Sequence, residues 1–378
     1  MEDPHYTVLS PTGGQEQGNQ HPPKDLMPPT SSKFKHWRWW LLVFLNILFL
    51  LVGQTAATLL GRFYYDQGGN SKWLSTLVQT AAFPLLLLPL ITLPNTSSSF
   101  STTDPRPSTT KLTLIYIALG LIIAADNLMY SYGLLYLPVS TYSLICASQL
   151  AFNAIFAFFL NSQRFTPLIL NSVVLLSFSS ALLGIDEESS SDSTDIPGGK
   201  YMLGFILTLG ASATYSLILS LMQLTFEKVI KKETFTVVLE MQIYTSFVAS
   251  CASVIGLFAS GEWNKLDGEY EEFGKGKASY VMTVVGIALA WQVASVGVVG
   301  LIFVVSSLFS NAISTLALPV VPVFAVIFFR DKINGVKVMA MLIAIWGFLS
   351  YLYQNYADDS KARRSLKDAR DIADTSVP

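Results

Sequence analysis

The stretch from Leu112 to Gln163 contains a single Asp, Glu, Lys or Arg side chain, Asp126. Charged residues make up about a quarter of an ordinary soluble domain, and one helical crossing of a bilayer takes about 20 apolar residues. This stretch is therefore long enough to cross a membrane twice. The whole chain has the same character, because only 13% of its 378 residues are charged and 51% are hydrophobic. These values predict a polytopic, all-α membrane protein.

Further charge-poor runs extend this interpretation along the chain. Leu137-Pro138 separates two of the predicted helices, because the residue before a proline is biased out of helix. Gly297 and Gly300 are taken to separate two others. The predicted crossings, about ten in number, are Trp37–Leu60, Trp73–Pro94, Leu112–Tyr136, Pro138–Leu160, Pro167–Ile185, Lys200–Leu224, Phe235–Ala259, Ala278–Val298, Leu301–Phe328 and Gly335–Tyr356.

The segments between and beyond these helices predict the orientation. Residues 1–36 are rich in Pro, Gly, Gln and Ser and are expected to form a disordered tail. Lys and Arg gather before the first helix, after the sixth, and in the tail at 357–378, whereas the linker at 186–199 is acidic. Because basic loops remain on the cytoplasmic side, both termini are predicted to be cytoplasmic and the acidic linker extracellular.

Two similar segments indicate an internal repeat. "FFLNSQRFTP" (Phe158–Pro167) and "IFFRDKINGV" (Ile327–Val336) each connect a helix to the next one, at an offset of about half the helical region. Repeats of five helices must insert with opposite orientations. We therefore predict two inverted five-helix repeats, at 37–185 and 200–356, an arrangement typical of transporters that bind their substrate near the membrane midplane.

Several polar side chains lie within the predicted spans and must face the helix bundle, since an unpaired polar group in hydrocarbon costs several kcal/mol. Tyr142, Gln149 and Asn153 lie on one helical face. The amides of Gln149 and Asn153 could hydrogen-bond the polar edge of a substrate, and the alternative is that they bond neighbouring helices. Tyr130 and Trp291 join Tyr142 as candidates for stacking on a flat ring, although core packing is the alternative for each. The remaining substrate-binding candidates are Gln54, Asn127, Gln292 and Asn311.

Two carboxylates fall within predicted spans, Asp126 and Glu240. Acids inside a membrane are rare and generally functional, and burial favours their protonated form. Either could therefore carry a proton. Asp126 lies deeper in its helix, whereas Glu240 lies close to the cytoplasmic lysines and has the alternative of an interfacial ion pair.

The sequence argues against other function classes. The histidines, His5, His21 and His36, all precede the first apolar run, and the cysteines, Cys146 and Cys251, have no metal-ligand spacing. We therefore expect no metal, no other cofactor and no enzymatic activity. The net charge of −2 gives no indication of nucleic-acid binding. A channel fits the inverted repeat and its compact polar midplane less well than a carrier does.

Three long segments carry a family resemblance: "GQTAATLLGRFYYDQGGNSKWLSTLVQTAAFPLLLLP" (Gly53–Pro89), "YSYGLLYLPVSTYSLICASQLAFNAIFAFFLNSQRFTP" (Tyr130–Pro167) and "WQVASVGVVGLIFVVSSLFSNAISTLALPVVPVFAVIFFRDK" (Trp291–Lys332). The chain resembles the plant purine permease family of the drug/metabolite transporter superfamily. The resemblance implies a proton-coupled plasma-membrane importer of adenine, cytokinins and related heterocycles. We expect a monomer or a homodimer. Another flat nitrogen heterocycle, such as an alkaloid or vitamin, is the alternative substrate.

Overall fold

The computed structural model describes residues 29–92, 109–161, 166–189, 198–230, 235–304, 307–330 and 334–351, with 353, 354 and 357. The predicted tails fall almost entirely outside these residues, and so does most of the acidic linker. The chain divides into a short unit that ends at Leu41 and a compact unit that begins at Leu42. The short unit contributes the beginning of a helix and the exposed side chains of Trp39 and Trp40.

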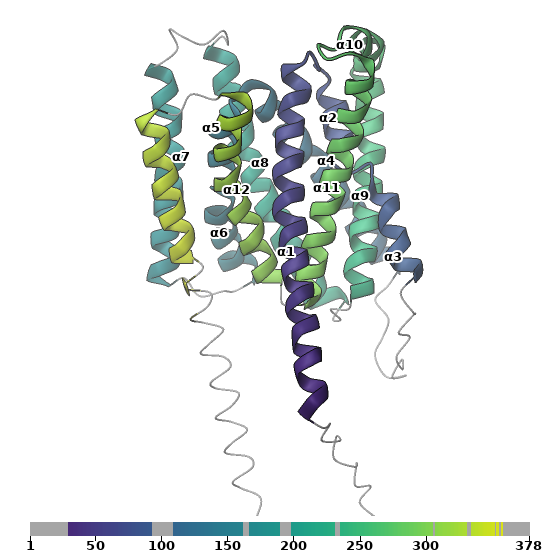
Figure 1. Ribbon diagram of the computed structural model, residues 1–378, viewed down its shortest axis with the longest axis vertical. Helices are drawn as coiled ribbons and strands as arrows, with labels where there is room; N and C mark the ends of the chain where they lie inside the picture. Colours follow the sequence, from purple (N-terminus) through teal and green to yellow (C-terminus); the bar gives the residue numbers. More distant parts are fainter. Residues whose placement is uncertain are drawn as a thin grey trace, which may run out of the picture. The chain divides into compact units, whose positions relative to one another are not determined.

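The described residues form helices and no strands (Figure 1). A helix over Gly335–Tyr351 follows the last of the labelled ones. The labelled elements are α1 (Pro29–Asp66), α2 (Lys72–Val78), η1 (Phe83–Leu86), α3 (Leu87–Thr92), α4 (Thr109–Tyr136), α5 (Val139–Cys146), α6 (Gln149–Asn161), α7 (Pro167–Ser189), α8 (Gly198–Thr225), η2 (Phe226–Ile230), α9 (Phe235–Ala259), η3 (Glu262–Lys265), α10 (Leu266–Glu272), α11 (Lys277–Val304) and α12 (Ser307–Phe329).

Six spans within the described residues are long and apolar enough to cross a membrane, and three shorter apolar helices accompany them. The long spans are Trp39–Asp66, Thr109–Tyr136, Val139–Leu160, Gly199–Ile230, Leu239–Ala259 and Lys277–Leu301. Large apolar side chains such as Phe44, Ile91 and Met282 are exposed on the helix surfaces. The chain is thus an all-α membrane protein, as its composition predicts.

The second predicted helix is discontinuous, which corrects the single span expected over Trp73–Pro94. α2 ends at Val78, a turn follows, and the chain continues as the 3₁₀ helix η1 and then α3. Pro84 stands in the first turn of η1, because proline has no N–H to donate within a continuing α-helix. The amides of Phe83 and Leu85 instead bond carbonyls three residues back, at 3.1 and 3.0 Å.

The span over Val139–Leu160 also changes its pitch midway. α5 ends at Cys146 and α6 begins at Gln149, and between them the amides of Ser148 and Leu150 bond carbonyls three residues back, at 3.0 and 3.3 Å. The boundary predicted at Leu137-Pro138 is confirmed, since α4 ends at Tyr136 and α5 begins at Val139.

Gly297 and Gly300 do not separate two helices, which corrects the predicted boundary. Both lie inside α11, which continues to Val304. Their role is close packing on α1, because a Cβ atom on Gly297 would lie 2.6 Å from the backbone nitrogen of Leu50. Gly53 of α1 faces Ala294 of α11 in the same way, at 2.6 Å from its backbone nitrogen. Small residues allow two membrane helices to approach this closely without a driving force from water.

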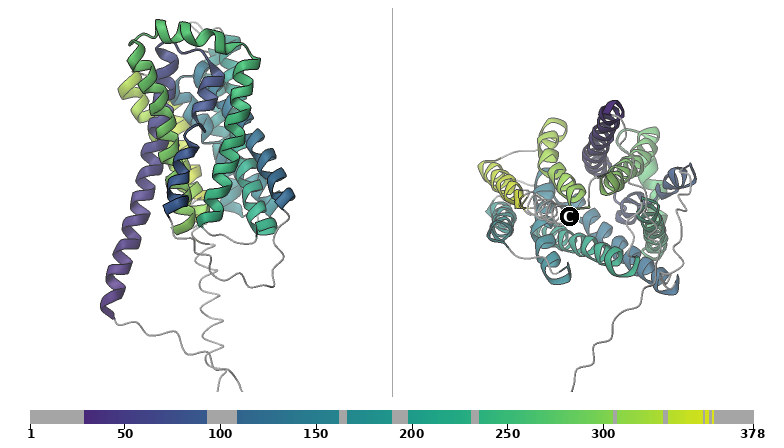
Figure 2. Two further views of the ribbon diagram at one scale, coloured as in Figure 1. Left: turned by 90° about the vertical axis from the view of Figure 1, so that its right-hand side faces the viewer. Right: turned by 90° about the horizontal axis from the view of Figure 1, so that it is seen from below.

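α1 lies at the edge of the helices of the compact unit, with α11 beside it (Figure 2). α4 packs against α8 on one side and α9 on another, and α2 contacts both α4 and α9. α6 packs against α8, and α12 packs against α5 and α11. The largest hydrophobic cluster joins Tyr64, Leu137, Ile145, Leu150 and other buried residues of these helices.

The connection from α9 to α11 forms a polar cap over residues 260–276, here called the α10 cap. It is tied to the end of α1 and the start of α2: the amide of Gly274 donates to the carbonyl of Gln67 at 2.9 Å, and the Tyr64 hydroxyl donates to Glu269 at 2.6 Å. Burial raises the pKa of Glu269, and the hydrogen bond from Tyr64 opposes this increase.

Glu262 is the second anchor of the α10 cap. Its carboxylate accepts from the Ser71 hydroxyl at 2.8 Å and the Trp73 amide at 3.1 Å, and it pairs with Lys72 at 3.1 Å. Partial burial opposes its ionisation, but these donors outweigh burial and lower the pKa of Glu262. Glu262 therefore holds the cap as a carboxylate ion.

Close packing at Gly297 predicts the effect of adding one methyl group. Gly297→Ala should destabilise the purified protein by about 1–3 kcal/mol, because backbone atoms cannot move aside as a side chain can. The matched control is Gly286→Ala on the same helix, where the added atom would meet only the tip of Leu60 at 3.2 Å. Thermal unfolding in detergent measures both variants. Equal unfolding midpoints for the two would contradict the assigned packing.

The lowered pKa of Glu262 predicts how the α10 cap responds to pH. The ionised carboxylate stabilises the cap above that pKa, and this contribution is lost as the pH falls through it. Glu262→Gln should therefore lower the protection of the Trp73 amide against hydrogen exchange about tenfold at neutral pH and should abolish the loss of that protection in acid. Glu272→Gln, at an exposed position of the same cap, is the control. Unchanged exchange in Glu262→Gln would remove Glu262 as the anchor.

Candidate functional site

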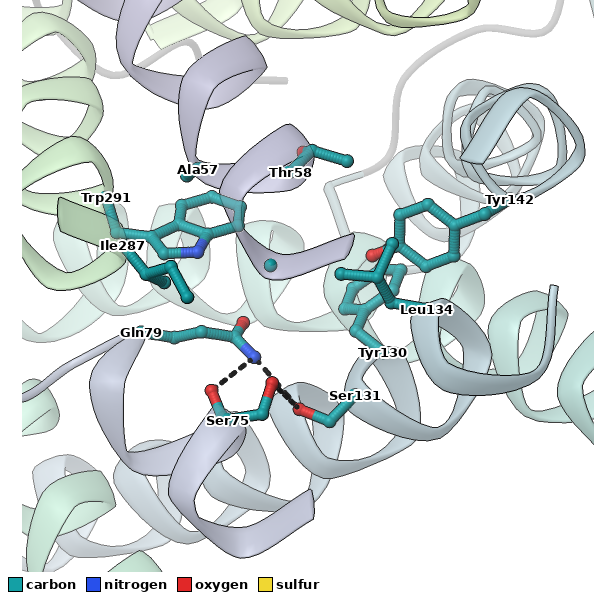
Figure 3. A pocket seen from close by; sticks show the side chains of 11 residues that line it. Ala57, Thr58, Ser75, Gln79, Tyr130, Ser131, Leu134, Tyr142, Ile287 and Trp291 are labelled. Atoms are coloured by element: carbon teal, nitrogen blue, oxygen red, sulfur yellow. Dashed lines mark hydrogen bonds between the residues drawn. The ribbon is translucent and has the colours of Figure 1, made fainter. Parts of the chain in front are cut away.

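A cavity lies in the compact unit where five helices meet. α1, α2, α4, α5 and α11 supply its lining, which is Ala57, Thr58, Gly61, Ser75, Gln79, Tyr130, Ser131, Leu134, Tyr142, Ile287 and Trp291 (Figure 3). Its volume of about 20 Å³ is enough for about one water molecule. Pockets that hold small molecules generally enclose roughly 300 Å³ or more, so the cavity is nearly closed in this conformation.

Aromatic side chains form two opposite walls of the cavity. The indole of Trp291 on α11 stands on one side, and Tyr130 and Tyr142 stand on the other (Figure 3). The two tyrosine rings contact each other edge to face, with centroids 6.0 Å apart and planes at 75°. Walls of this kind suit a flat, aromatic molecule, because ring faces stack favourably on one another.

An amide forms the polar side of the cavity. The Gln79 Nε2 atom donates to the Ser75 carbonyl at 3.2 Å, the Asn127 carbonyl at 3.4 Å and the Ser131 hydroxyl at 3.2 Å. The Ser131 hydroxyl in turn lies 3.2 Å from that of Ser75 and 3.2 Å from that of Thr76. These bonds hold α2 against α4 and fix the position of the amide.

Three of the predicted substrate-binding residues come together in this cavity: Tyr130, Tyr142 and Trp291. Asn127 contributes the backbone carbonyl that positions Gln79. Sequence reasoning missed Gln79 itself. The available signal was a lone amide in the apolar run after Trp73, one helical turn after Ser75.

Gln54 and Gln292 are buried but do not line the cavity. The Gln54 side chain accepts from the Ser314 hydroxyl on α12 at 3.0 Å, and it lies one turn before Thr58 on α1. Gln292 follows Trp291 on α11, and its Nε2 atom has no hydrogen-bond partner among the described residues. The substrate-binding role predicted for these two amides remains a prediction.

Gln149 and Asn153 face other helices rather than the cavity. Gln149 donates to the Thr315 hydroxyl of α12 at 3.3 Å, and its backbone carbonyl accepts from Ser216 of α8 at 2.6 Å. Asn153 donates to the Tyr351 hydroxyl at 3.4 Å. Asn311 lies in α12, and its side chain is outside the described part of the structure.

The two predicted proton carriers differ in their surroundings. Asp126 is only 2% exposed, lies one turn from Tyr130 on α4, and is close enough to Tyr130 and Tyr142 to interact with them electrostatically. Its Oδ1 atom has no hydrogen-bond partner among the described residues. Glu240 is half-buried and interacts with Tyr116, which lies about 15 Å from Asp126 along α4. Asp126 is therefore the carboxylate nearer to the cavity.

The described residues contain no cluster of three His, Cys, Asp or Glu side chains that could hold a metal ion. The chemical groups at the cavity are ring faces, one amide and hydroxyls. Such groups can bind and release a small molecule.

Comparison with known proteins identifies the family of this chain. Residues 41–361 match the family described as purine nucleobase transmembrane transport. Probable purine permease 11 of Arabidopsis thaliana is 62% identical over 91% of this chain and 90% of its own length. Probable purine permease 10 and purine permease 21 of the same plant are 56% and 53% identical, each over 90% of this chain and 86% of its own length. The family consists of transporters rather than enzymes, and this chain belongs to the purine permease family.

Proposed function

We propose that this chain is a proton-coupled secondary transporter that imports purine nucleobases and derivatives, such as adenine and cytokinins, by alternating access. The observation that carries the proposal is the cavity, where aromatic walls face each other across the Gln79 amide. A purine is flat, apolar on its two faces and polar along its edge. Stacking on Trp291 or the tyrosine pair would bind the faces, and the amide would bind the edge.

Transport requires this cavity to open. A volume of about 20 Å³ cannot hold a purine, so the lining helices must move apart before substrate enters. We propose α2 as the moving part, because it is only seven residues long and is followed by the irregular turn before η1. Helices interrupted near the midplane are typical of carriers in which two halves rock about a central site.

We further propose the organisation in which this movement takes place. The chain would comprise about ten helices as two inverted five-helix repeats at 37–185 and 200–356, joined by an extracellular linker at 186–199. The tails at 1–36 and 357–378 would both be cytoplasmic, in accordance with the positions of the basic residues. The protein would act in the plasma membrane as a monomer or homodimer.

Asp126 is our proposed proton carrier. A carboxyl group that is 2% exposed, with an oxygen that has no partner among the described residues, is costly when ionised. Its position one turn from Tyr130 would allow substrate binding to alter its surroundings. Proton release toward the cytoplasm would then follow the change of access.

A carrier for another flat nitrogen heterocycle, such as an alkaloid or vitamin, is the alternative. Stacking walls accept any aromatic ring of suitable size, and one amide provides limited discrimination. Competition among substrates separates the two possibilities, because the compound that inhibits at the lowest concentration identifies the preferred class.

Uptake measurements test the main proposal. Transport-deficient cells that express the chain should accumulate labelled adenine with saturation, and a protonophore should abolish accumulation. Trp291→Ala should weaken adenine affinity about tenfold, because it removes one stacking wall. Trp346→Ala, at a position 63% exposed on the last helix, is the matched control. Non-saturating uptake would point to a channel, and equal affinity in both variants would exclude Trp291 from the site.

A second experiment tests the proton carrier. Asp126→Asn keeps the shape of the side chain but fixes it in a neutral form. Uptake driven by a pH gradient should fail, whereas exchange of labelled for unlabelled adenine across the membrane, which moves no net proton, should partly survive. Glu240→Gln serves as the comparison. Uphill uptake that survives in Asp126→Asn but not in Glu240→Gln would assign the proton to Glu240.

A further inference from the structure

The hydrogen bonds of Gln79 determine which end of its amide faces the cavity. Its nitrogen lies 3.2 Å from the Ser75 carbonyl and 3.4 Å from the Asn127 carbonyl. Both partners are backbone carbonyl oxygens, which accept hydrogen bonds and never donate them. Only the NH₂ group can therefore occupy this position, and an exchanged amide would place two acceptors against its oxygen.

The Gln79 carbonyl oxygen consequently points the other way. Figure 3 shows it directed into the space between Trp291 and Tyr130. No described residue donates a hydrogen bond to it, although Gln79 itself is half-buried. The nearby Thr58 hydroxyl already donates to the Gln54 carbonyl at 2.9 Å. The polar side of the cavity thus presents a fixed acceptor.

We infer that Gln79 selects heterocycles that offer an N–H donor at the ring edge, which its carbonyl oxygen binds while the ring stacks between Trp291 and the tyrosine pair. This inference rests on the proposed transport of purines through the same cavity. A ligand edge with only lone pairs would leave the oxygen unpaired and would place two acceptors against each other. Both effects disfavour the ligand, so a single amide can discriminate by about tenfold.

Isomeric adenine derivatives test this selection in the unmodified protein. Adenine with one ethyl group on its exocyclic amine keeps an N–H on that nitrogen. Its isomer with two methyl groups on the same nitrogen has no N–H there. The second pair tests the N–H of the five-membered ring. Adenine methylated on its exocyclic amine keeps this N–H, and its isomer methylated on the ring nitrogen lacks it. Each compound is used to inhibit uptake of labelled adenine.

We expect at least one of these pairs to differ about tenfold in inhibition constant, in favour of the isomer that keeps its N–H. The affected pair identifies the N–H that Gln79 binds. Equal inhibition within both pairs would overturn the inference without any variant being made. It would leave the proposed function intact, because adenine uptake itself would still be observed. Absence of adenine uptake would instead overturn the proposed function.

Gln79→Leu then tests whether this residue is responsible. Within one variant, the ratio of two inhibition constants does not depend on how much protein reaches the membrane. The ratio for the affected pair should fall to about one in Gln79→Leu and stay unchanged in Gln242→Leu, the same substitution on α9. A ratio that persists in Gln79→Leu would assign the selection to another residue and overturn the inference. If Gln79→Leu does not transport, Gln79→Met provides the second variant, because it keeps the length of the side chain and removes its carbonyl oxygen. The ratio should fall to about one there as well, and a ratio that persists would overturn the inference.

Discussion

The lack of water in a bilayer is the constraint on which the rest of this structure depends. Every buried hydroxyl or amide must find a partner within the protein. Most hydroxyls here do so locally, as Ser143, Thr208 and Ser212 each donate to the carbonyl four residues back in their own helix. Such groups are satisfied without contributing to contacts between helices or to a site. The longer amides have to reach across to neighbouring helices.

At the candidate site, some buried polar atoms have hydrogen-bond partners within the protein and others do not. Gln79 uses its NH₂ group to hold α2 against α4 and leaves its carbonyl oxygen toward the cavity. Asp126 and Gln292 also retain buried polar atoms without partners among the described residues. An unpaired polar atom in a membrane interior is costly unless a ligand or a proton satisfies it for part of the transport cycle. What distinguishes this region is that the unpaired oxygen of Gln79 lies between aromatic walls.

The α10 cap connects this region to one end of the bundle. Its anchors on Tyr64 and Ser71 lie only one turn from the cavity residues Gly61 and Ser75. Movement of α1 and α2 away from the cap would therefore have to break the bonds to Glu269 and Glu262. The close contact between Gly53 and Ala294 restrains the same helices, α1 and α11, farther along the membrane. The bonds of the α10 cap and the contact between Gly53 and Ala294 thus both restrain helices that line the nearly closed cavity.

The sequence alone determines the fold class and part of the site. Long charge-free runs have no stable alternative to membrane helices, and proline marks the end of α4 for a local steric reason. Tyr130, Tyr142 and Trp291 could be proposed because aromatic side chains suit a flat ligand wherever they lie. The interruption of α2 and the continuation of α11 past Gly300 were not predicted correctly. A glycine or proline indicates where a helix can break or approach another, but not which of the two occurs.

Only the tertiary structure decided which polar groups meet. Gln149 and Asn153 share one helical face, yet their partners lie on α12 and the last helix. Gln79, directly after α2, joins the aromatic residues of α4, α5 and α11 instead. Helical periodicity determines which residues share a face of one helix. It carries no information about which neighbour that face will meet. That choice depends on how all the helices pack, and so the amide most clearly presented to the cavity could be identified only from the folded chain.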